Sequence, residues 1–399
     1  MPQTQSFGAR VQQLRQRRGM SREVFGGLVG KSAEWVKAVE RGRLLMPRLP
    51  MLLRMTEVLQ LDELVELTGT HQHLVESVTR SAHDEAVTVA DAMHTTTVPA
   101  LADEPDLVAL TGRVDDAWRR WTTLPDQKSA VADLLPDLLL GTRAAVAALD
   151  GQPRRHALAE LARVYSLAQC YWAWQPAGEY VWLSADRAMA AAQAADDPLA
   201  VAVATWYYAE VYRSAGQAER AAGVAVESAG LLDPEAGQEQ QARWGMLHLS
   251  AALSEAQLGR AGNTWRHWDQ AGRAADALGQ HYIHPWLRFG RVDVDGWALR
   301  LDNRLFRPVD ALRRADRYDV AALPSPGRRG ARLLDIAEAH RQRAETTAAV
   351  HMIGRAHRES PETVRYSLWA RQALLEMSEE RSSVRRDAKE LAAAIGLAG

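Results

Sequence analysis

The stretch VFGGLVGKSAEWVKAVERG, residues 24–42, is compatible with two different structures. Residues 26–32, GGLVGKS, look like a phosphate-binding loop, whereas residues 32–42, SAEWVKAVERG, look like a helix that could enter a DNA groove. A phosphate loop needs Gly, four residues and then Gly-Lys-Ser or Gly-Lys-Thr, after a buried strand. The first of these glycines would be residue 25, which is Phe25, and the preceding segment RQRRGMSRE is too polar for a buried strand. The helical interpretation is therefore favoured over nucleotide binding.

The residues before this stretch have the spacing of a helix. Phe7, Val11 and Leu14 recur at intervals of three and four residues, which gives the segment one apolar face. Gly19 is expected to end this first helix, because glycine commonly follows the last helical residue.

Two serines mark the starts of two further helices. Ser21 and Ser32 are each expected to cap a helix through the side-chain oxygen. Gly30 is expected to form the turn between these helices, and Gly42 to end the third helix. The residues expected to face inward are Val24, Phe25 and Leu28, then Trp35, Val36 and Val39. Two short helices joined by a glycine turn predict a helix-turn-helix.

Residues 14–42, LRQRRGMSREVFGGLVGKSAEWVKAVERG, resemble the Xre/Cro-type helix-turn-helix of phage repressors and many bacterial regulators. Residues 51–69, MLLRMTEVLQLDELVELTG, are similar to the two closing helices of the same five-helix domain. The matching features are Leu14, Arg15, Arg18, Gly19, Ser21, Leu28, Gly30, Ser32, Val36, Glu40 and Gly42, followed by Pro47.

Three features depart from the family pattern. Arg22 stands where the family usually has Gln, which keeps a phosphate donor and loses an amide. Gly26 and Gly27 each weaken the second helix by roughly 1 kcal/mol relative to Ala. Lys31 occupies a position that is usually apolar, so we expect its side chain to point outward or to snorkel.

The resemblance implies a set of DNA contacts if residues 32–41 lie in the major groove, with Ser32 at the start of the contact helix. Ala33 and Ala38 would touch thymine methyl groups, Glu34 would accept from cytosine, and Lys37 would donate to guanine. Phosphate contacts are expected from Arg22, Lys31, Arg41 and Arg43. Trp35 is either part of the core or a platform that faces the DNA backbone. Because one such module makes a small contact, we expect a homodimer on a palindromic or pseudo-palindromic site in double-stranded DNA.

The distribution of charge agrees with a nucleic-acid-binding N-terminus, although a solvated N-terminal helix would also explain it. Residues 1–50 carry a formal charge of +7 and the remaining residues −9, within a net charge of −2. We expect a cytoplasmic protein without a membrane span, because no run of about 18 apolar residues and no secretory leader is found. The single Cys170 excludes an internal disulfide and a cysteine-cluster metal site.

The sequence predicts an all-α chain in three parts. Residues 1–79 form the DNA-binding domain, residues 80–105, RSAHDEAVTVADAMHTTTVPALADEP, form a linker with poor helical periodicity, and residues 106–399 form a helical-repeat domain. In the last part, small residues recur at fixed distances from three alanines that are spaced 43 and 85 residues apart, Ala209, Ala252 and Ala337. At plus seven stand Gly216, Gly259 and Ala344, and at plus twelve stand Ala221, Thr264 and Ala349.

These repeats resemble a tetratricopeptide-type α-solenoid of helical hairpins with repeats longer than usual; a degenerate repeat near residues 285–320 fills the gap. Such solenoids curve around a groove. The aromatic residues of the repeats, either interhelical core or groove lining, are Trp172, Trp174, Trp182, Trp206, Tyr207, Tyr208, Trp244, Trp265, Trp268, Trp286 and Trp297. The candidate ligand-binding residues are Trp172, Trp206, Tyr208, Arg243, Trp244, Asn263 and Arg291.

The order of the two domains resembles bacterial regulators whose repeat domain senses a signal, such as the Gram-positive peptide-pheromone receptors and Arg- and Ala-rich actinobacterial regulators. The resemblance implies a transcriptional regulator in which a peptide, a small molecule or a partner protein bound in the repeat groove modulates operator binding. The alternative is a scaffold whose repeats bind a regulatory protein and no small ligand. Without a nucleophile motif or a glycine-rich cofactor loop, we expect neither enzymatic activity nor a cofactor.

No metal site is expected. His281 with His284, and Asp293 with Asp295, have the spacing of a ligand pair but lack a third clustered partner. Polar residues at helix ends explain them better.

Overall fold

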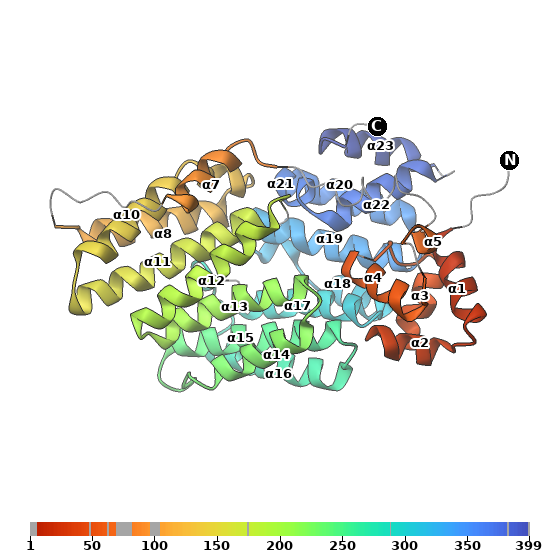
Figure 1. The fold of residues 1–399 in the computed structure, drawn as a ribbon, viewed down its shortest axis with the longest axis horizontal. Helices are drawn as coiled ribbons and strands as arrows, with labels where there is room; N and C mark the ends of the chain where they lie inside the picture. Colours follow the sequence, from red (N-terminus) through yellow and green to blue (C-terminus); the bar gives the residue numbers. More distant parts are fainter. Residues whose placement is uncertain are drawn as a thin grey trace.

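The computed structural model describes residues 6–47, 49–61, 64–68, 82–95, 104–173, 175–287, 289–380 and 383–397. Throughout these residues the chain is helical, with one isolated bridge between Ile283 and Gly290, and this confirms the predicted all-α fold (Figure 1). The first helices are α1 (Phe7–Arg17), α2 (Arg22–Val29), α3 (Ala33–Glu40), α4 (Leu49–Val58), α5 (Leu64–Thr68) and α7 (Ala86–His94). No helix of this part of the chain is long and apolar enough to cross a membrane.

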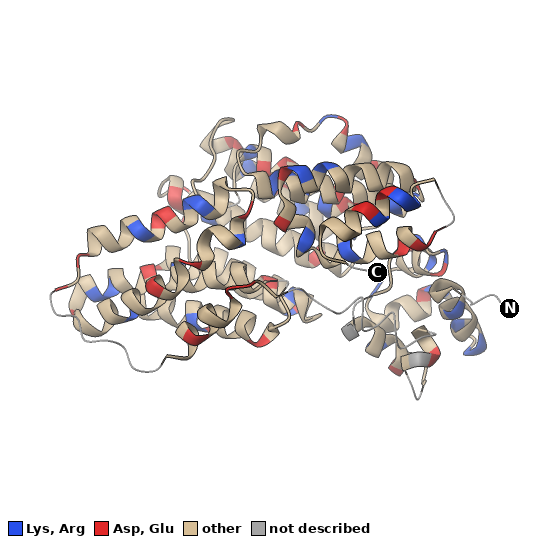
Figure 2. Cartoon of the chain, turned by 90° about the horizontal axis from the view of Figure 1, so that it is seen from above, with Lys and Arg blue, Asp and Glu red and all other residues tan. Residues whose placement is uncertain are grey.

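The remaining helices pack mainly as hairpins, and we call residues 104–397 the hairpin domain. They are α8 (Leu107–Thr123), α9 (Gln127–Ala132), α10 (Leu135–Ala148), α11 (Gly151–Trp172), α12 (Gly178–Ala195), α13 (Pro198–Ser214), α14 (Ala218–Ala229), α15 (Gln238–Gln257), α16 (Ala261–Leu278), α17 (Arg291–Arg304), α18 (Pro308–Ala315), the 3-10 turn η1 (Val320–Ala322), α19 (Pro326–Gln342), α20 (Thr346–Glu359), α21 (Pro361–Arg365), α22 (Leu368–Glu379) and α23 (Arg385–Ala394). Acidic and basic residues are mixed along these helices (Figure 2).

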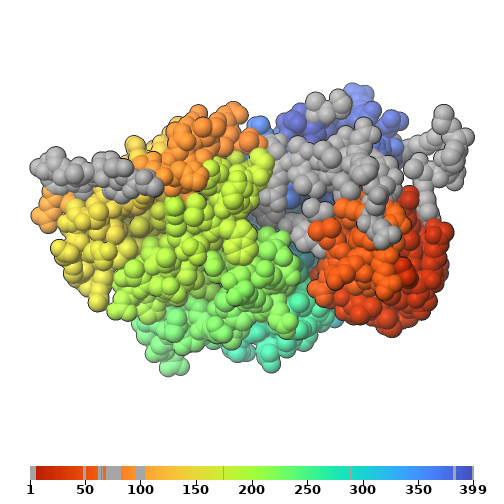
Figure 3. Space-filling model, in the orientation of Figure 1, coloured from red at the N-terminus to blue at the C-terminus, as the bar shows by residue number. Residues whose placement is uncertain are grey.

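Helices α1–α5 form a separate small bundle, the head, which lies at one end of the hairpin domain (Figures 1 and 3). Both predicted caps are confirmed: Ser21 Oγ accepts from the backbone N–H of Val24 at 3.2 Å, and Ser32 Oγ accepts from that of Trp35 at 3.2 Å. Gly30 has φ +70° and ends α2 in the left-handed conformation, which L side chains adopt at a cost. The core of the head consists of Val11, Phe25, Val29, Trp35, Val36, Val39, Leu52, Met55, Leu59 and Leu67.

One prediction about α2 is wrong. Val24 and Leu28 were expected to face inward, yet their side chains are 54% and 48% exposed. Phe25 and Val29 are buried instead, and these two positions, four residues apart, already supply the inner face of so short a helix.

Gly26 and Gly27 are adjacent in α2 but have opposite surroundings. A Cβ on Gly26 would lie 2.7 Å from the carbonyl oxygen of Lys31, in the backbone just before α3, whereas a Cβ on Gly27 would meet nothing within 4 Å. We therefore expect Gly27→Ala to stabilise the head by about 0.4–1 kcal/mol and Gly26→Ala to destabilise it by about 1–3 kcal/mol. Amide hydrogen exchange of α2 and α3 in the two full-length variants measures both effects, and equal signs would contradict this account.

The segment predicted to be a linker contains a helix. α7, Ala86–His94, packs against the hairpin domain, and Val89, Ala92 and Met93 lie buried in its core. The spacing of these three residues gives the short helix an apolar stripe, although Thr88, Ala90 and Asp91 around them obscure it in the sequence. Among the described residues, 82–95 therefore belong structurally to the hairpin domain.

The hairpin pairing predicted from small residues is found in the structure. Ala209, Ala252 and Ala337 are fully buried in α13, α15 and α19, the first helices of three hairpins. The small residues twelve positions on are also fully buried, in α14, α16 and α20: Ala221, Thr264 and Ala349. The predicted degenerate repeat corresponds to the hairpin α17–α18.

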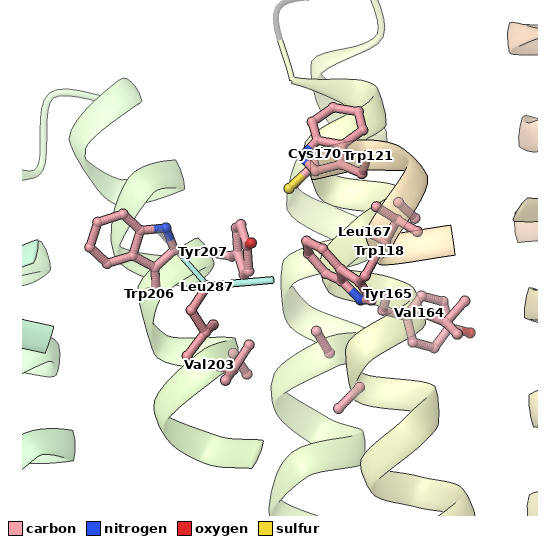
Figure 4. Packing of buried hydrophobic residues seen from close by; sticks show 14 of the residues in the cluster. Trp118, Trp121, Val164, Tyr165, Leu167, Cys170, Val203, Trp206, Tyr207 and Leu287 are labelled. Carbon is pink, nitrogen blue, oxygen red and sulfur yellow. The ribbon is translucent and has the colours of Figure 1, made fainter. Parts of the chain in front are cut away.

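The two ends of the hairpin domain are tied to each other. The carboxylate of Glu362 in α21 accepts from the backbone N–H groups of Lys128 and Ser129 at the start of α9, at 2.6 and 3.2 Å. Ser360 Oγ also donates to the carbonyl of Pro125 at 2.6 Å. Aromatic and aliphatic side chains fill the interior, where Tyr207 lies 6.2 Å from Trp118 between ring centroids (Figure 4).

Candidate functional site

One side of α3 is exposed along its length. Val36, Val39 and Glu40 are buried, whereas Glu34 and Arg41 are exposed and the two residues between them on this face, Lys37 and Ala38, are partly exposed. Because these four positions follow helical spacing, they form one stripe on the surface of the head. Lys37 Nζ lies 3.2 Å from a carboxylate oxygen of Glu34, in a pair that solvent reaches. The stripe contains three of the four predicted base contacts; the fourth, Ala33, is half-buried at the start of the helix.

A buried carboxylate joins α3 to α1 and α2. The side chain of Glu40 is 1% exposed and lies 2.5 Å from Arg15 Nε and 2.6 Å from Arg22 Nε. Arg22, predicted to contact phosphate, is thus held by an ion pair inside the head, and its side chain remains 35% exposed. Two charge-assisted hydrogen bonds to one carboxylate fix the orientation of α3 relative to the first two helices.

Trp35 belongs to the core. Its side chain is 6% exposed and packs with Phe25 and Val29, so it cannot serve as the platform for the DNA backbone that one interpretation of the sequence allowed. Arg41 and Arg43, in contrast, are exposed just after the end of α3. Their positions allow the predicted phosphate contacts.

The amino group of Lys31 contacts the hairpin domain, whereas the sequence predicts a side chain that points outward or snorkels. Its Nζ donates to the backbone carbonyl of Gln257, the last residue of α15, at 2.5 Å. Burial, together with the positive charges of Arg304 and Arg54, lowers the pKa of Lys31 to about 8. Next to it, Ser32 is exposed, but its Cβ lies 3.9 Å from the position that a Cβ on Gly259 would take. The start of α3 is thus in contact with the turn between α15 and α16.

The hairpin domain contains a cavity of about 840 Å³, bordered by α11, the start of α13 with the turn before it, and α15. Arg163 lines it, with its guanidinium 4.7 Å from the ring centroid of Trp286 and ion pairs to Asp115 at 2.5 Å and Glu160 at 2.9 Å. Burial raises the pKa of Glu160, and the neighbouring Arg163 opposes this rise.

A second arginine, Arg243 of α15, lines the same cavity. Its guanidinium lies 5.7 Å from the Trp286 ring and pairs with Glu239. The Nε atoms of Arg163 and Arg243 are buried without a hydrogen-bond acceptor among the described residues. Apolar side chains complete the wall: Leu107, Ala159, Ala162, Leu199, Ala200 and Val203. Two guanidinium groups beside an indole and an apolar wall suit a ligand that has both acceptor oxygens and apolar parts.

The structure places one of the seven predicted ligand-binding residues, Arg243, at this cavity. Trp172 and Trp206 are 1% and 4% exposed and lie in the core, where they contact Tyr180 and Trp297. The other four lie among other partners: Tyr208 contacts Trp182 and Tyr212, Trp244 contacts His248, Asn263 donates to Glu255, and Arg291 pairs with Asp276 and Asp295. Trp174 lies outside the described residues.

Sequence reasoning missed Glu160 and Arg163. They are three residues apart on α11, and only the fold brings them to the same cavity as Trp286, so no local pattern in the sequence marks them.

The residues considered as metal ligands lie in other interactions. Buried His284 lies 3.4 Å from a carboxylate oxygen of Glu239, and Asp293 forms a buried ion pair with Arg328 at 3.0 Å. Asp295 pairs with Arg291. The part of the chain that the structure describes contains no group of three potential metal ligands.

Comparison with protein families supports the assignment of the head. Residues 6–67 match the family model of a helix-turn-helix domain, which covers α1–α4 and nearly all of α5. Searches with the chain among curated proteins and among solved structures gave no match. The N-terminal part of the protein is therefore a helix-turn-helix domain, a class of domain that suggests a DNA-binding regulator.

Proposed function

We propose that the protein is an Xre-type transcriptional regulator that binds an operator in double-stranded DNA as a homodimer. The observation that carries this proposal is the surface stripe formed by Glu34, Lys37 and Ala38 of α3 and by Arg41 just after it. In helix-turn-helix proteins this helix enters the major groove. A single head presents a small surface, which favours two heads on a two-fold related site.

The hairpin domain is proposed to be of tetratricopeptide type and to bind the modulating ligand in its cavity. The indole of Trp286 and the guanidinium groups of Arg163 and Arg243 suit an extended peptide, an amphipathic small molecule or a segment of a partner protein. A ligand that changes operator affinity by five- to about a hundredfold needs a coupling of only about 1–3 kcal/mol. The proposed role is regulatory, in the cytoplasm, and involves neither catalysis nor a cofactor.

The test is selection of bound sequences from a pool of randomised duplexes, followed by affinity measurements on Lys37→Ala and Arg43→Ala. Lys37→Ala is expected to lose about 1–3 kcal/mol of discrimination at one base pair. Arg43→Ala is expected to weaken all sequences alike and to reduce the slope of log affinity against log salt by about 1. A footprint that neither change alters would reject α3 as the reading helix.

A further inference from the structure

The head rests on the hairpin domain at three places. Lys31 and Ser32 meet the turn between α15 and α16, and Phe306, in the turn between α17 and α18, packs against the core of the head. At the third place Leu45 packs against the core of the last helices, and Gln372 of α22 donates to the carbonyl of Met46 at 3.3 Å. Figure 3 shows the resulting contact between the head and the rest of the molecule.

The first of these contacts lies where DNA would have to be. In a helix-turn-helix the N-terminal part of the recognition helix approaches the base edges. The major groove is about 12 Å wide and an α-helix with its side chains about 10–12 Å across, so the groove admits one helix and little else. Gln257, at the end of α15, and Gly259, in the turn that follows, lie against Lys31 and Ser32 at the start of α3. A duplex engaged by α3 would collide with this turn.

The second contact is made by a residue in an unfavourable backbone conformation. The turns of successive hairpins carry Gly216, Gly259, Phe306 and Ala344 with φ of +79°, +76°, +58° and +64°. Glycine adopts this left-handed conformation freely, whereas an aromatic residue there is strained. Phe306 is the member of this set that packs against the core of the head. A strained residue that is retained at such a position points to a function of its side chain. Because the Phe306 side chain packs against the core of the head, we infer that this function is to hold the head.

We propose that the hairpin domain holds the head in a closed arrangement, in which the turn between α15 and α16 covers the start of α3, and that duplex DNA binds only after this contact opens. This inference rests on the DNA-binding function proposed above and specifies how that function is regulated.

The closed arrangement has the properties of a contact that can open. It consists of side chains from three separate places, and it buries the amino group of Lys31, which desolvation disfavours in its charged form. Two helices also reach from the cavity to the head: α15 carries Arg243 near its start and Gln257 at its end, and α17 lies between Trp286 and Phe306. A ligand that shifts either helix would therefore act directly on the contact with the head.

The test is a reversible crosslink, Ser32→Cys with Gly259→Cys, in the full-length chain. The expected Cβ separation of 3.9 Å suits a disulfide, and the natural Cys170 is buried, so we expect it not to react. We expect the disulfide to form on oxidation, and the oxidised protein to bind selected duplexes at least about a hundredfold more weakly than the same protein after reduction, because the competent state is then removed. The single variant Ser32→Cys, which loses the same cap, is expected to show no effect of oxidation.

Two results of the crosslinking experiment would overturn the proposal: no disulfide on oxidation, or an oxidised form that binds DNA as tightly as the reduced form. If the disulfide forms and yet no duplex is selected by any form of the protein, the DNA-binding function itself fails, and this inference fails with it.

Because cysteine at Gly259 must adopt φ +76°, a second pair of variants gives an independent test. Phe306→Gly and Ala344→Gly both relieve a strained turn, but only the first removes a contact with the head. We expect Phe306→Gly to bind the selected duplexes several-fold more tightly and Ala344→Gly to bind them as the natural protein does. Unchanged or weaker binding by Phe306→Gly would overturn the closed arrangement.

Discussion

Replacing Glu40 with alanine is expected to lower the stability of the head by about 3–5 kcal/mol, because the change leaves a buried charge without its partner. The side chain of Arg15 is 7% exposed and donates to Glu40 at 2.5 Å, so its guanidinium would remain in the core with the opposite charge gone. Arg22 would lose its partner as well, and α3 would lose its ion pairs to both α1 and α2. Because native domains are stable by only about 5–15 kcal/mol, a loss of this size leaves the head partly unfolded.

The measurement is amide hydrogen exchange of α1–α3 in the full-length protein, where a loss of 1.4 kcal/mol corresponds to about tenfold less protection. Glu34→Ala is the matched control, since Glu34 is a carboxylate of the same helix whose pair with Lys37 is exposed to solvent. Such a pair contributes about 0–1 kcal/mol, so the control should keep its protection. Equal protection in the two variants would show that the ion pairs of Glu40 do not hold the head together.

The features that local sequence predicted well are those that depend on a few neighbouring residues. A serine hydroxyl can reach the N–H groups of the next turn without help from the rest of the chain, so Ser21 and Ser32 identified two helix starts. Gly30 identified a turn for a similarly local reason. The small residues of the hairpins were informative because two helices that pack closely leave no room for larger ones.

The features that sequence did not predict depend on contacts between distant segments. Lys31 occupies a usually apolar position, which shows that something is unusual, but its acceptor is 226 residues away in α15. Phe306 at a turn position gave no local sign that the head would cover it. For the same reason the sequence predicts the cavity only in part. The residue type alone suggests Arg243, whereas only the fold brings Arg163 against Trp286.

The aromatic residues show the limit of composition as a guide. A groove and a core both attract tryptophan, and only burial separates them. Trp172 and Trp206 lie in the interior, whereas Trp286 lines the cavity. Hydrogen bonds between the segments of α9 and α21 close the hairpin domain, whereas an open solenoid would leave these segments apart.

A second large loss of stability is expected on replacing Lys128, whose side chain takes part in this closure. Its side chain is 4% exposed, and its Nζ donates to the carbonyl oxygens of Cys170, Tyr171 and Ala173 at 3.0, 2.5 and 2.9 Å, at the end of α11. The same amino group lies 5.1 Å from the ring centroid of Tyr366, just after α21. One cation thus satisfies the carbonyl groups that end a long helix and joins the two ends of the domain.

Lys128→Met preserves much of the volume and removes the three donors. Each buried carbonyl left without a partner costs about 1–3 kcal/mol. Tyr171 keeps a donor, because Nε2 of Gln175 lies 2.5 Å from its carbonyl oxygen, so the loss at the carbonyls of Cys170 and Ala173 should amount to about 2 kcal/mol or more. Lys389→Met, at an exposed lysine of α23, changes the same residue type and is expected to stay within about 0.5 kcal/mol of the natural protein. Denaturant unfolding followed by circular dichroism compares the midpoints, and hydrogen exchange at the end of α11 locates the loss. Because each hairpin of such an array depends on its neighbours, we expect the loss of protection to spread from α9 and α11 to α21. Coincident unfolding midpoints for the two variants would refute this role of Lys128.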